Sequence, residues 1–122
     1  MQQGTKRFFL ADLMGDHFLL NLYGCDEQKL DDEVFIRDVL DSAAYCAKMT
    51  VLNVASHKFS PQGVTCILLL AESHISIHTW PESGKAACDV YTCGDPQNAK
   101  LACDVIRCQL SALEHEIQHI KR

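Results

Sequence analysis

A short segment in the middle of this 122-residue chain contains the side chains best suited to chemistry. The hydroxyl of Ser73 directly follows the carboxylate of Glu72, and two imidazoles, His74 and His78, come within the next five residues. Farther along, Tyr91-Thr92-Cys93-Gly94 adds a thiol in a turn of small residues. A hydroxyl beside acid–base groups is suited to nucleophilic attack. The first target that we consider is the peptide bond before Ser73.

Two possible metal sites in the sequence have simpler explanations. His115-Glu116-Ile117-Gln118-His119 matches the HExxH zinc motif, but only three residues follow it, and a catalytic zinc needs a third protein ligand. The segment also alternates, and as a strand it would hold its two imidazoles about 13 Å apart. We interpret it as a surface strand or a frayed helix end. The same distance excludes a metal shared by His74 and His78, so no metal site is predicted.

Ser73 also lies outside a G-x-S-x-G nucleophile elbow. A Ser-His-acid hydrolase with His78 as its base stays open at this point, although no residue is evident that would orient the imidazole.

Hydrophobic periodicity predicts the elements that must position these residues. Helices are expected over Leu30–Met49, which Asp31 or Asp32 can cap, and over Ala99–Leu113. Strands are expected at Phe18–Tyr23, Thr50–Phe59, Val64–Leu70, His74–Thr79 and Ala86–Thr92, with another possible after the second helix.

Two of these strands differ in pattern. Val64–Leu70 is continuously apolar and predicts a strand buried on both faces, whereas His74–Thr79 alternates, with its histidines and Ser76 on one face. The whole order predicts an α+β fold with helices on one face of the sheet. The uncovered face would be buried by pairing with a second copy.

Composition excludes several classes of function. Eleven basic residues against 16 acidic ones give a net charge of -5, and no Lys/Arg stripe suggests a nucleic-acid partner. No segment reaches the roughly 18 apolar residues of a membrane helix. Met1–Arg7 is polar and the apolar stretch from Phe8 is broken at Asp12, so no signal peptide is predicted. The seven cysteines are expected to be reduced thiols, mostly in the core, of a single-domain cytoplasmic protein.

The residues from Glu72 to Glu82, Glu-Ser-His-Ile-Ser-Ile-His-Thr-Trp-Pro-Glu, closely resemble the signature of bacterial and archaeal S-adenosylmethionine decarboxylases. The resemblance continues over most of the chain, in Leu22-Tyr23-Gly24-Cys25, Ala43-Ala44, His57-Lys58-Phe59-x-Pro61-x-Gly63-Val64 and Asp89-x-Tyr91-Thr92-Cys93-Gly94-Asp95. A match this long and ordered is specific.

The resemblance implies a proenzyme that cleaves itself between Glu72 and Ser73, leaving a beta chain, residues 1–72, and an alpha chain, residues 73–122. The Ser73 hydroxyl would add to the Glu72 carbonyl and form an ester, whose elimination and hydrolysis leave a pyruvoyl group as cofactor. His78 matches the family histidine that accepts a proton during processing. Thr65 stands where the family usually has a serine that supports the same step.

In the mature enzyme, the resemblance implies a Schiff base between the pyruvoyl carbonyl and the substrate amine, with electrons accepted as CO2 leaves. Cys93 matches the proton donor of this decarboxylation, and a thiol is suited to that role near neutrality. Phe59 corresponds to an aromatic that stacks on adenine, and Glu82 to a carboxylate that binds the ribose hydroxyls. The product would be the aminopropyl donor for spermidine synthesis.

The family fold is a two-layer α/β sandwich with an antiparallel sheet, and cleaved protomers pair through their sheets into a homodimer with two sites. Ser83 and Lys85 stand where the family often has aromatic residues, and some members accept arginine or ornithine. The same pyruvoyl chemistry on those substrates is therefore the alternative. An inactive binding homologue is a third possibility, but it would have no physical need for Ser73, His78 and Cys93 together.

Overall fold

A computed structural model describes residues 13–122 and arranges them as one six-stranded sheet with helices against it. In chain order the elements are β1 (Asp16–Tyr23), α2 (Glu27–Leu30), α3 (Glu33–Cys46), β2 (Val51–Lys58), β3 (Val64–Leu70), β4 (Ser73–Trp80), the 3-10 turn η1 (Pro81–Ser83), β5 (Lys85–Thr92), α4 (Pro96–Gln109) and β6 (Glu114–Lys121). The strands lie in the order β2-β3-β4-β5-β1-β6, and all neighbours are antiparallel.

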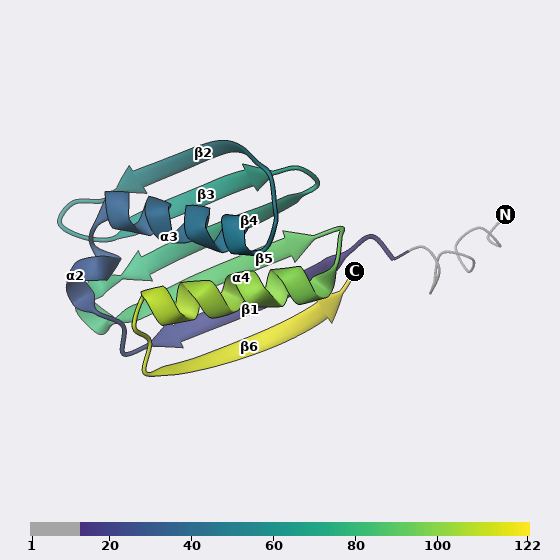
Figure 1. The fold of residues 1–122 in the computed structure, drawn as a ribbon. Coiled ribbons are helices and arrows are strands. Elements are labelled where there is room, and N and C mark those ends of the chain that lie inside the picture. The colour runs from purple at the N-terminus through teal and green to yellow at the C-terminus, as the bar shows by residue number, and fades with distance from the viewer. Residues whose placement is uncertain (1–12) are drawn as a thin grey trace, which may run out of the picture.

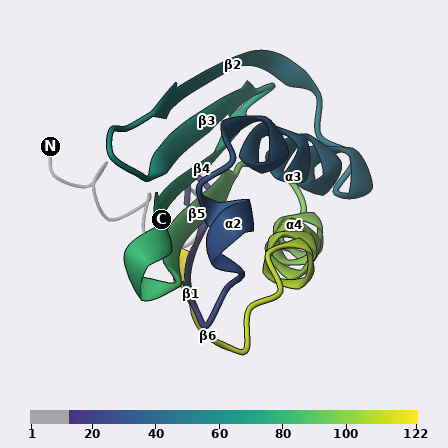
Figure 2. The ribbon, with the colours of Figure 1, turned by 90° about the vertical axis from the view of Figure 1, so that its left-hand side faces the viewer.

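The helices α3 and α4 lie side by side against one face of the sheet (Figure 1). Seen along the helices, the other face has no element of the described residues over it (Figure 2). We call it the uncovered face. The predicted α+β fold, with an antiparallel sheet and helices on one side only, is confirmed.

Alternation along the strands decides which side chains reach each face. In β4, Ile75 and Ile77 are fully buried under the helices, whereas His74, Ser76 and His78 lie on the uncovered face, because successive side chains of a strand point to opposite sides. The predicted alternation is confirmed. The helices complete the core with Ile36, Val39, Leu40, Ala43 and Ala44 from α3 and Ala99, Ala102, Cys103 and Ile106 from α4.

Two neighbouring aspartates have different roles at the start of α3. Asp32 caps the helix, since its side chain accepts a hydrogen bond of 3.0 Å from the backbone N–H of Phe35. Asp31 instead accepts a 2.8 Å hydrogen bond from the backbone N–H of Gly63. That contact fixes the turn between β2 and β3 against the helical layer.

The second long helix begins earlier and ends earlier than its apolar periodicity predicts. It starts at Pro96 rather than Ala99, because Asp95 caps it and proline is well tolerated in the first turn. It ends at Gln109, and Leu113 belongs to the connection that leads into β6.

The prediction that Val64–Leu70 is buried on both faces is wrong. Every second residue of β3 is buried, but Ile67 is 45% exposed and Leu69 is 52% exposed. Among residues 13–122, helices cover only one side of the sheet, so the apolar side chains on the other side have no cover from this part of the chain. Their exposure places an apolar surface on the uncovered face.

The HExxH segment is a strand. β6 pairs with β1 so that His115 stands opposite Leu22 and His119 opposite Phe18. The interpretation as a surface strand is confirmed, and the strand geometry keeps the two imidazoles about 13 Å apart.

Four cysteines are core residues and three are exposed; all seven are free thiols. Burial raises the pKa of Cys25 and Cys66 to about 11 and that of Cys103 to about 12, so these thiols stay protonated. Cys88 is buried with them, as expected for small apolar core residues.

Within the described part of the chain, no helix has the length and apolar character needed to cross a membrane. The prediction that no signal peptide is present concerns residues 1–12, which lie outside the described residues.

Candidate active site

Ser73 opens β4, directly after a tight turn formed by Ala71 and Glu72. Its hydroxyl donates a 3.3 Å hydrogen bond to Oγ1 of Thr92, the buried residue opposite it on β5. Thr92 Oγ1 also accepts from the backbone N–H of Gly94 at 3.0 Å. The hydroxyl of Ser73 therefore faces a fixed acceptor, at the edge of a cavity of about 180 Å³.

The residue before Ser73 has a strained backbone. Glu72 has a φ of 64°, in the left-handed region that costs a residue with a Cβ atom about 1–2 kcal/mol. Strain of this kind is concentrated at functional sites. Here it lies on the carbonyl side of the predicted cleavage point.

Sequence reasoning assigned no role to Thr92. Its hydroxyl is significant only because the register of β4 and β5 places it opposite Ser73. The one available signal was its position before Cys93 in a cluster of small polar residues, and that signal does not reveal a cross-strand partner.

Cys93 is exposed and follows the last residue of β5. Burial and the neighbouring Cys93 thiol raise the pKa of Tyr91, two residues before it in the chain. The phenol therefore stays neutral at physiological pH. The end of β5 thus brings a thiol and a phenol to the same end of the sheet as Ser73, because Ser73 pairs with Thr92.

The other predicted site residues gather at the opposite end of β4. Nδ1 of His78 lies 3.0 Å from Oγ1 of Thr65, its cross-strand neighbour on β3. Phe59 and Glu82 line the same cavity, of about 290 Å³, as these two residues. Trp80 also lines it, and its ring centroid lies 6.5 Å from that of His78.

The structure therefore divides the predicted site residues into two groups. Ser73 and Cys93 lie at the start of β4 and the end of β5, whereas His78 lies five residues along β4, about 16 Å from Ser73 at the rise of an extended strand. A proton acceptor must come within about 3 Å of the group that it deprotonates. One protomer alone does not bring Ser73 and His78 together.

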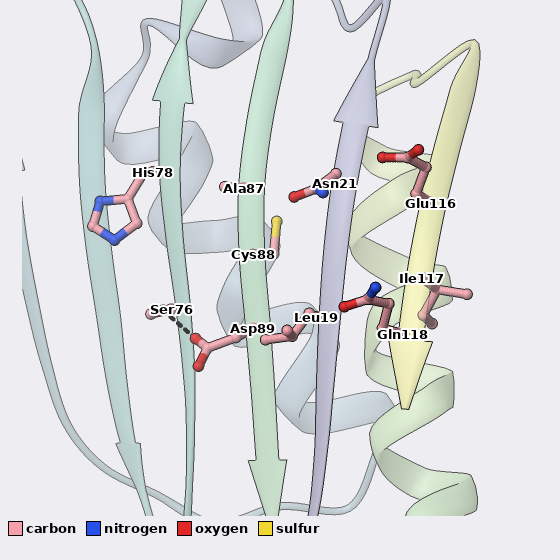
Figure 3. A pocket seen from close by; sticks show the side chains of 10 residues that line it. All are labelled: Leu19, Asn21, Ser76, His78, Ala87, Cys88, Asp89, Glu116, Ile117 and Gln118. Carbon is pink, nitrogen blue, oxygen red and sulfur yellow. Dashed lines mark hydrogen bonds between the residues drawn. The ribbon is translucent and has the colours of Figure 1, made fainter. Parts of the chain in front are cut away.

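A shallow hollow of about 640 Å³ lies beside His78 on the uncovered face and extends over β5, β1 and β6. His78, Ser76 and Asp89 line it from β4 and β5, and Asn21 and Glu116 line it from β1 and β6 (Figure 3). The hollow is open to solvent, and its lining mixes apolar and polar side chains.

Asp89 collects three side-chain donors on this face. Its carboxylate accepts from His17 Nε2 at 2.7 Å, from His74 Nε2 at 3.0 Å and from the Ser76 hydroxyl. Burial raises the pKa of Asp89, but these hydrogen bonds outweigh it, and the net pKa is lowered. In residues 13–122, His17, His74 and Asp89 are the one group of three potential metal ligands close enough to share an ion. Sequence reasoning had predicted no metal site and had given none of the three a role.

Comparison with known proteins assigns the family. A family model described as S-adenosylmethionine decarboxylase matches residues 16–122. The chain is 52% identical over 110 residues to an S-adenosylmethionine decarboxylase proenzyme of Synechococcus sp. (strain WH7803), covering 90% of this chain and 86% of that protein. A proenzyme of the same name from Methanococcus aeolicus is 45% identical over 109 residues, covering 89% of this chain and 93% of its own length.

The fold agrees with the sequence match. The crystal structure of the adenosylmethionine decarboxylase from Aquifex aeolicus VF5 superposes with a TM-score of 0.86 at 44% identity, covering 90% of this chain and 91% of that one. The two-layer architecture and the sequence match together define an enzyme of the decarboxylase class. The chain belongs to the S-adenosylmethionine decarboxylase family, and the resemblance inferred from the sequence is confirmed.

Proposed function

We propose that this chain cleaves itself between Glu72 and Ser73 and then decarboxylates S-adenosyl-L-methionine with a pyruvoyl group formed from Ser73. The observation that carries this proposal is the geometry at the start of β4. A serine hydroxyl bonded to buried Thr92 follows directly on a residue with left-handed backbone. The cleaved protein would consist of chains 1–72 and 73–122.

The residues around Ser73 suit this self-cleavage. Thr92 accepts the hydroxyl hydrogen, which orients the oxygen whose lone pairs add to the Glu72 carbonyl. The bond between Glu72 and the Ser73 nitrogen breaks as the ester bond to the serine oxygen forms. Loss of the Glu72 carboxylate by elimination, followed by hydrolysis that releases ammonia, leaves a ketone at position 73.

The residues present fit a ketone at position 73, because the Thr92 hydroxyl lies beside it and the exposed Cys93 thiol follows directly after Thr92. When formed, a pyruvoyl group binds a substrate amine and accepts the electron pair released with CO2. Cys93, at the same end of the sheet, would supply the proton that replaces the carboxylate. Tyr91, held neutral beside it, can donate to the thiolate that remains.

The second group of residues suits a nucleoside. Phe59 and Trp80 offer two half-exposed aromatic rings around one cavity, and Glu82 adds a carboxylate that can accept hydrogen bonds from ribose hydroxyls. Arginine and ornithine would leave this nucleoside-sized cavity unfilled. The names of the relatives also favour S-adenosylmethionine over those substrates.

We further propose that two protomers pack their uncovered faces together in opposite orientations. Such a dimer would bring the His78 and Thr65 of one protomer to the start of β4 in the other, so the distance of about 16 Å along one strand would no longer separate the two groups. The Ser73 side chain, which points toward the helices like Ile75, would turn toward the uncovered face to meet them. The exposed apolar side chains on the uncovered face, Ile67 and Leu69, support a sheet-to-sheet interface. The processed enzyme would act in the cytoplasm on a precursor of spermidine.

The test is an intact-mass spectrum followed by a CO2-release assay. Two fragments are expected, the one from position 73 being lighter than a hydrolysed serine terminus by one ammonia. Labelled CO2 is expected from S-adenosylmethionine and not from arginine or ornithine. A Ser73→Ala variant should stay intact, folded and inactive. A wild-type chain that remains at 13.7 kDa after long incubation would refute the processing proposal.

A further inference from the structure

His74 has no part in the cleavage chemistry, yet it lies in the most connected polar cluster of the uncovered face. Its Nε2 is 3.0 Å from Oδ2 of Asp89, and the same oxygen lies 2.7 Å from Nε2 of His17. Ser76 donates to the other oxygen of the carboxylate. Three adjacent strands, β1, β4 and β5, therefore meet at Asp89, whose side chain is only 22% exposed.

The position of His74 in the chain gives this cluster its importance. The backbone nitrogen of His74 is bonded to the carbonyl of residue 73, so after cleavage it carries the whole new terminus. Before cleavage, the turn through Glu72 also connects Ser73 to β3. Cleavage removes that connection, and the side chain and backbone of His74 become the nearest anchors of the reactive end.

The ring of His74 connects this anchor to the thiol. It stacks against Tyr91, with ring centroids 5.9 Å apart and planes 26° apart. Tyr91 is packed from other sides by the edge of His17 at 5.6 Å and by the Arg122 guanidinium at 5.8 Å. The same tyrosine stands two residues before Cys93 in the chain, and Cys93 contributes to its raised pKa.

We propose that Asp89 and Tyr91 together hold the ring of His74 in one position. We call His74, Asp89 and Tyr91 the His74 clamp, and it keeps the carbonyl of residue 73 in place relative to the Cys93 thiol. The three are positioning residues, because they act on the reacting atoms through the backbone of His74 and through the thiol. This inference rests on the proposed function. It adds to that function the residues that hold the new terminus beside the Cys93 thiol.

The same groups resemble a two-histidine, one-carboxylate metal site, but their hydrogen bonds favour the clamp. The guanidinium of Arg122 lies 3.4 Å from Nδ1 of His17, so Nδ1 accepts and the proton lies on Nε2, facing Asp89. A fixed cation beside the cluster opposes a metal ion. The carboxylate also already accepts hydrogen bonds from three side-chain donors.

Two substitutions of His74 separate its hydrogen bond from its ring. His74→Gln places an amide donor near the position of Nε2, whereas His74→Phe keeps a ring against Tyr91 and removes the donor. His119 provides matched controls, since its Nε2 lies 2.6 Å from an Asp16 oxygen and its side chain is 37% exposed, against 40% for His74. It lies on β6, away from position 73, and receives the same two substitutions.

The two His74 variants and the two His119 variants are all expected to cleave themselves. In size-exclusion chromatography they should elute at the same volume as the wild-type oligomer. His74→Phe should lower kcat by about ten- to a hundredfold, the loss expected from a misplaced reacting group, while KM changes by less than about threefold. His74→Gln should recover most of that loss. Both His119 variants should keep the wild-type kcat within about twofold, because His119 contacts Asp16 and stacks on Phe18 but touches neither residue 73 nor Cys93.

Three results would overturn the clamp. They are a wild-type kcat in His74→Phe, equal losses of kcat in the His74 and His119 variants, and a loss of kcat in His74→Gln as large as that in His74→Phe. Activity that is lost with a chelator and restored by zinc would also overturn it, because the cluster would then bind a metal. A wild-type protein that neither cleaves nor releases CO2 would instead refute the proposed function, and the clamp with it.

Discussion

Mixing two inactive variants tests whether the active site is shared between protomers. Ser73→Ala removes the nucleophile and His78→Ala removes the proton acceptor, and neither variant should cleave alone, since removing a positioned acid–base group costs about 10²–10⁴-fold in rate. Five residues of extended strand separate the two side chains by about 16 Å. In a mixed dimer, the Ser73 of the His78→Ala chain would face the His78 of the Ser73→Ala chain.

That mixed dimer has one complete site and one site that lacks both groups. Random pairing at equal amounts makes about half of the dimers mixed. About half of the His78→Ala chains should therefore be cleaved, and none of the Ser73→Ala chains. The two chains would be coexpressed with tags of different mass and followed by intact-mass spectrometry.

The control partner is the double variant Ser73→Ala/His78→Ala, which forms the same dimers without supplying a histidine. His78→Ala chains mixed with it should stay intact. The reasoning is refuted if His78→Ala stays intact beside Ser73→Ala as well, or if it cleaves to completion alone.

Three further predictions follow from individual contacts. Glu72→Gly should slow cleavage by about fivefold, because it relieves ~1 kcal/mol of strain from the left-handed backbone at this position. Glu72→Ala keeps that strain and should cleave faster than Glu72→Gly in a gel time course. Equal cleavage rates of the two variants would exclude a role for strain. Thr92→Val should slow cleavage by about tenfold, because Ser73 loses its hydrogen-bond acceptor. Thr92→Ser keeps a hydroxyl and should restore the cleavage rate. Equal cleavage rates of Thr92→Val and Thr92→Ser would show that the contact is unimportant. The pKa of Asp89 is lowered in the folded protein, so its contribution to the free energy of unfolding is present above the unfolded pKa of about 4 and is lost as pH falls through the folded pKa. Urea titrations between pH 2 and pH 6 bracket the ordinary carboxyl pKa of about 4. They should show that the free energy of unfolding falls more steeply with decreasing pH in the wild type than in Asp89→Asn. Parallel pH dependences of the two proteins would contradict this.

Much of the fold could be predicted because it depends on local pattern. The alternation of His74–Thr79 specified which side chains share a face, and an aspartate capped α3 as its sequence position indicated. The prediction for Val64–Leu70 failed for a reason outside that segment. An apolar run indicates burial but does not say what covers it, and here no second cover lies among the described residues.

The candidate site was harder to predict, because it depends on strand register. The residues of the site were identified by resemblance, but the contact of Ser73 with Thr92 and that of His78 with Thr65 both follow from which residues stand opposite each other. Register is set by the turns and by the packed face together, and neither can be read from the spacing of chemical groups. For the same reason the convergence of His17, His74 and Asp89 from three strands had no sequence signal.

The separation of Ser73 from His78 along one strand has a consequence for when cleavage occurs. A chain whose nucleophile and proton acceptor meet only between protomers can fold with the β3–β4 connection intact, and it cleaves after two copies associate. Cleavage should then slow on dilution below the dimer dissociation constant, with the dimer fraction followed by sedimentation and the cleaved fraction by mass. A cleavage rate that stays constant while the dimer dissociates would show that one protomer completes the site by itself.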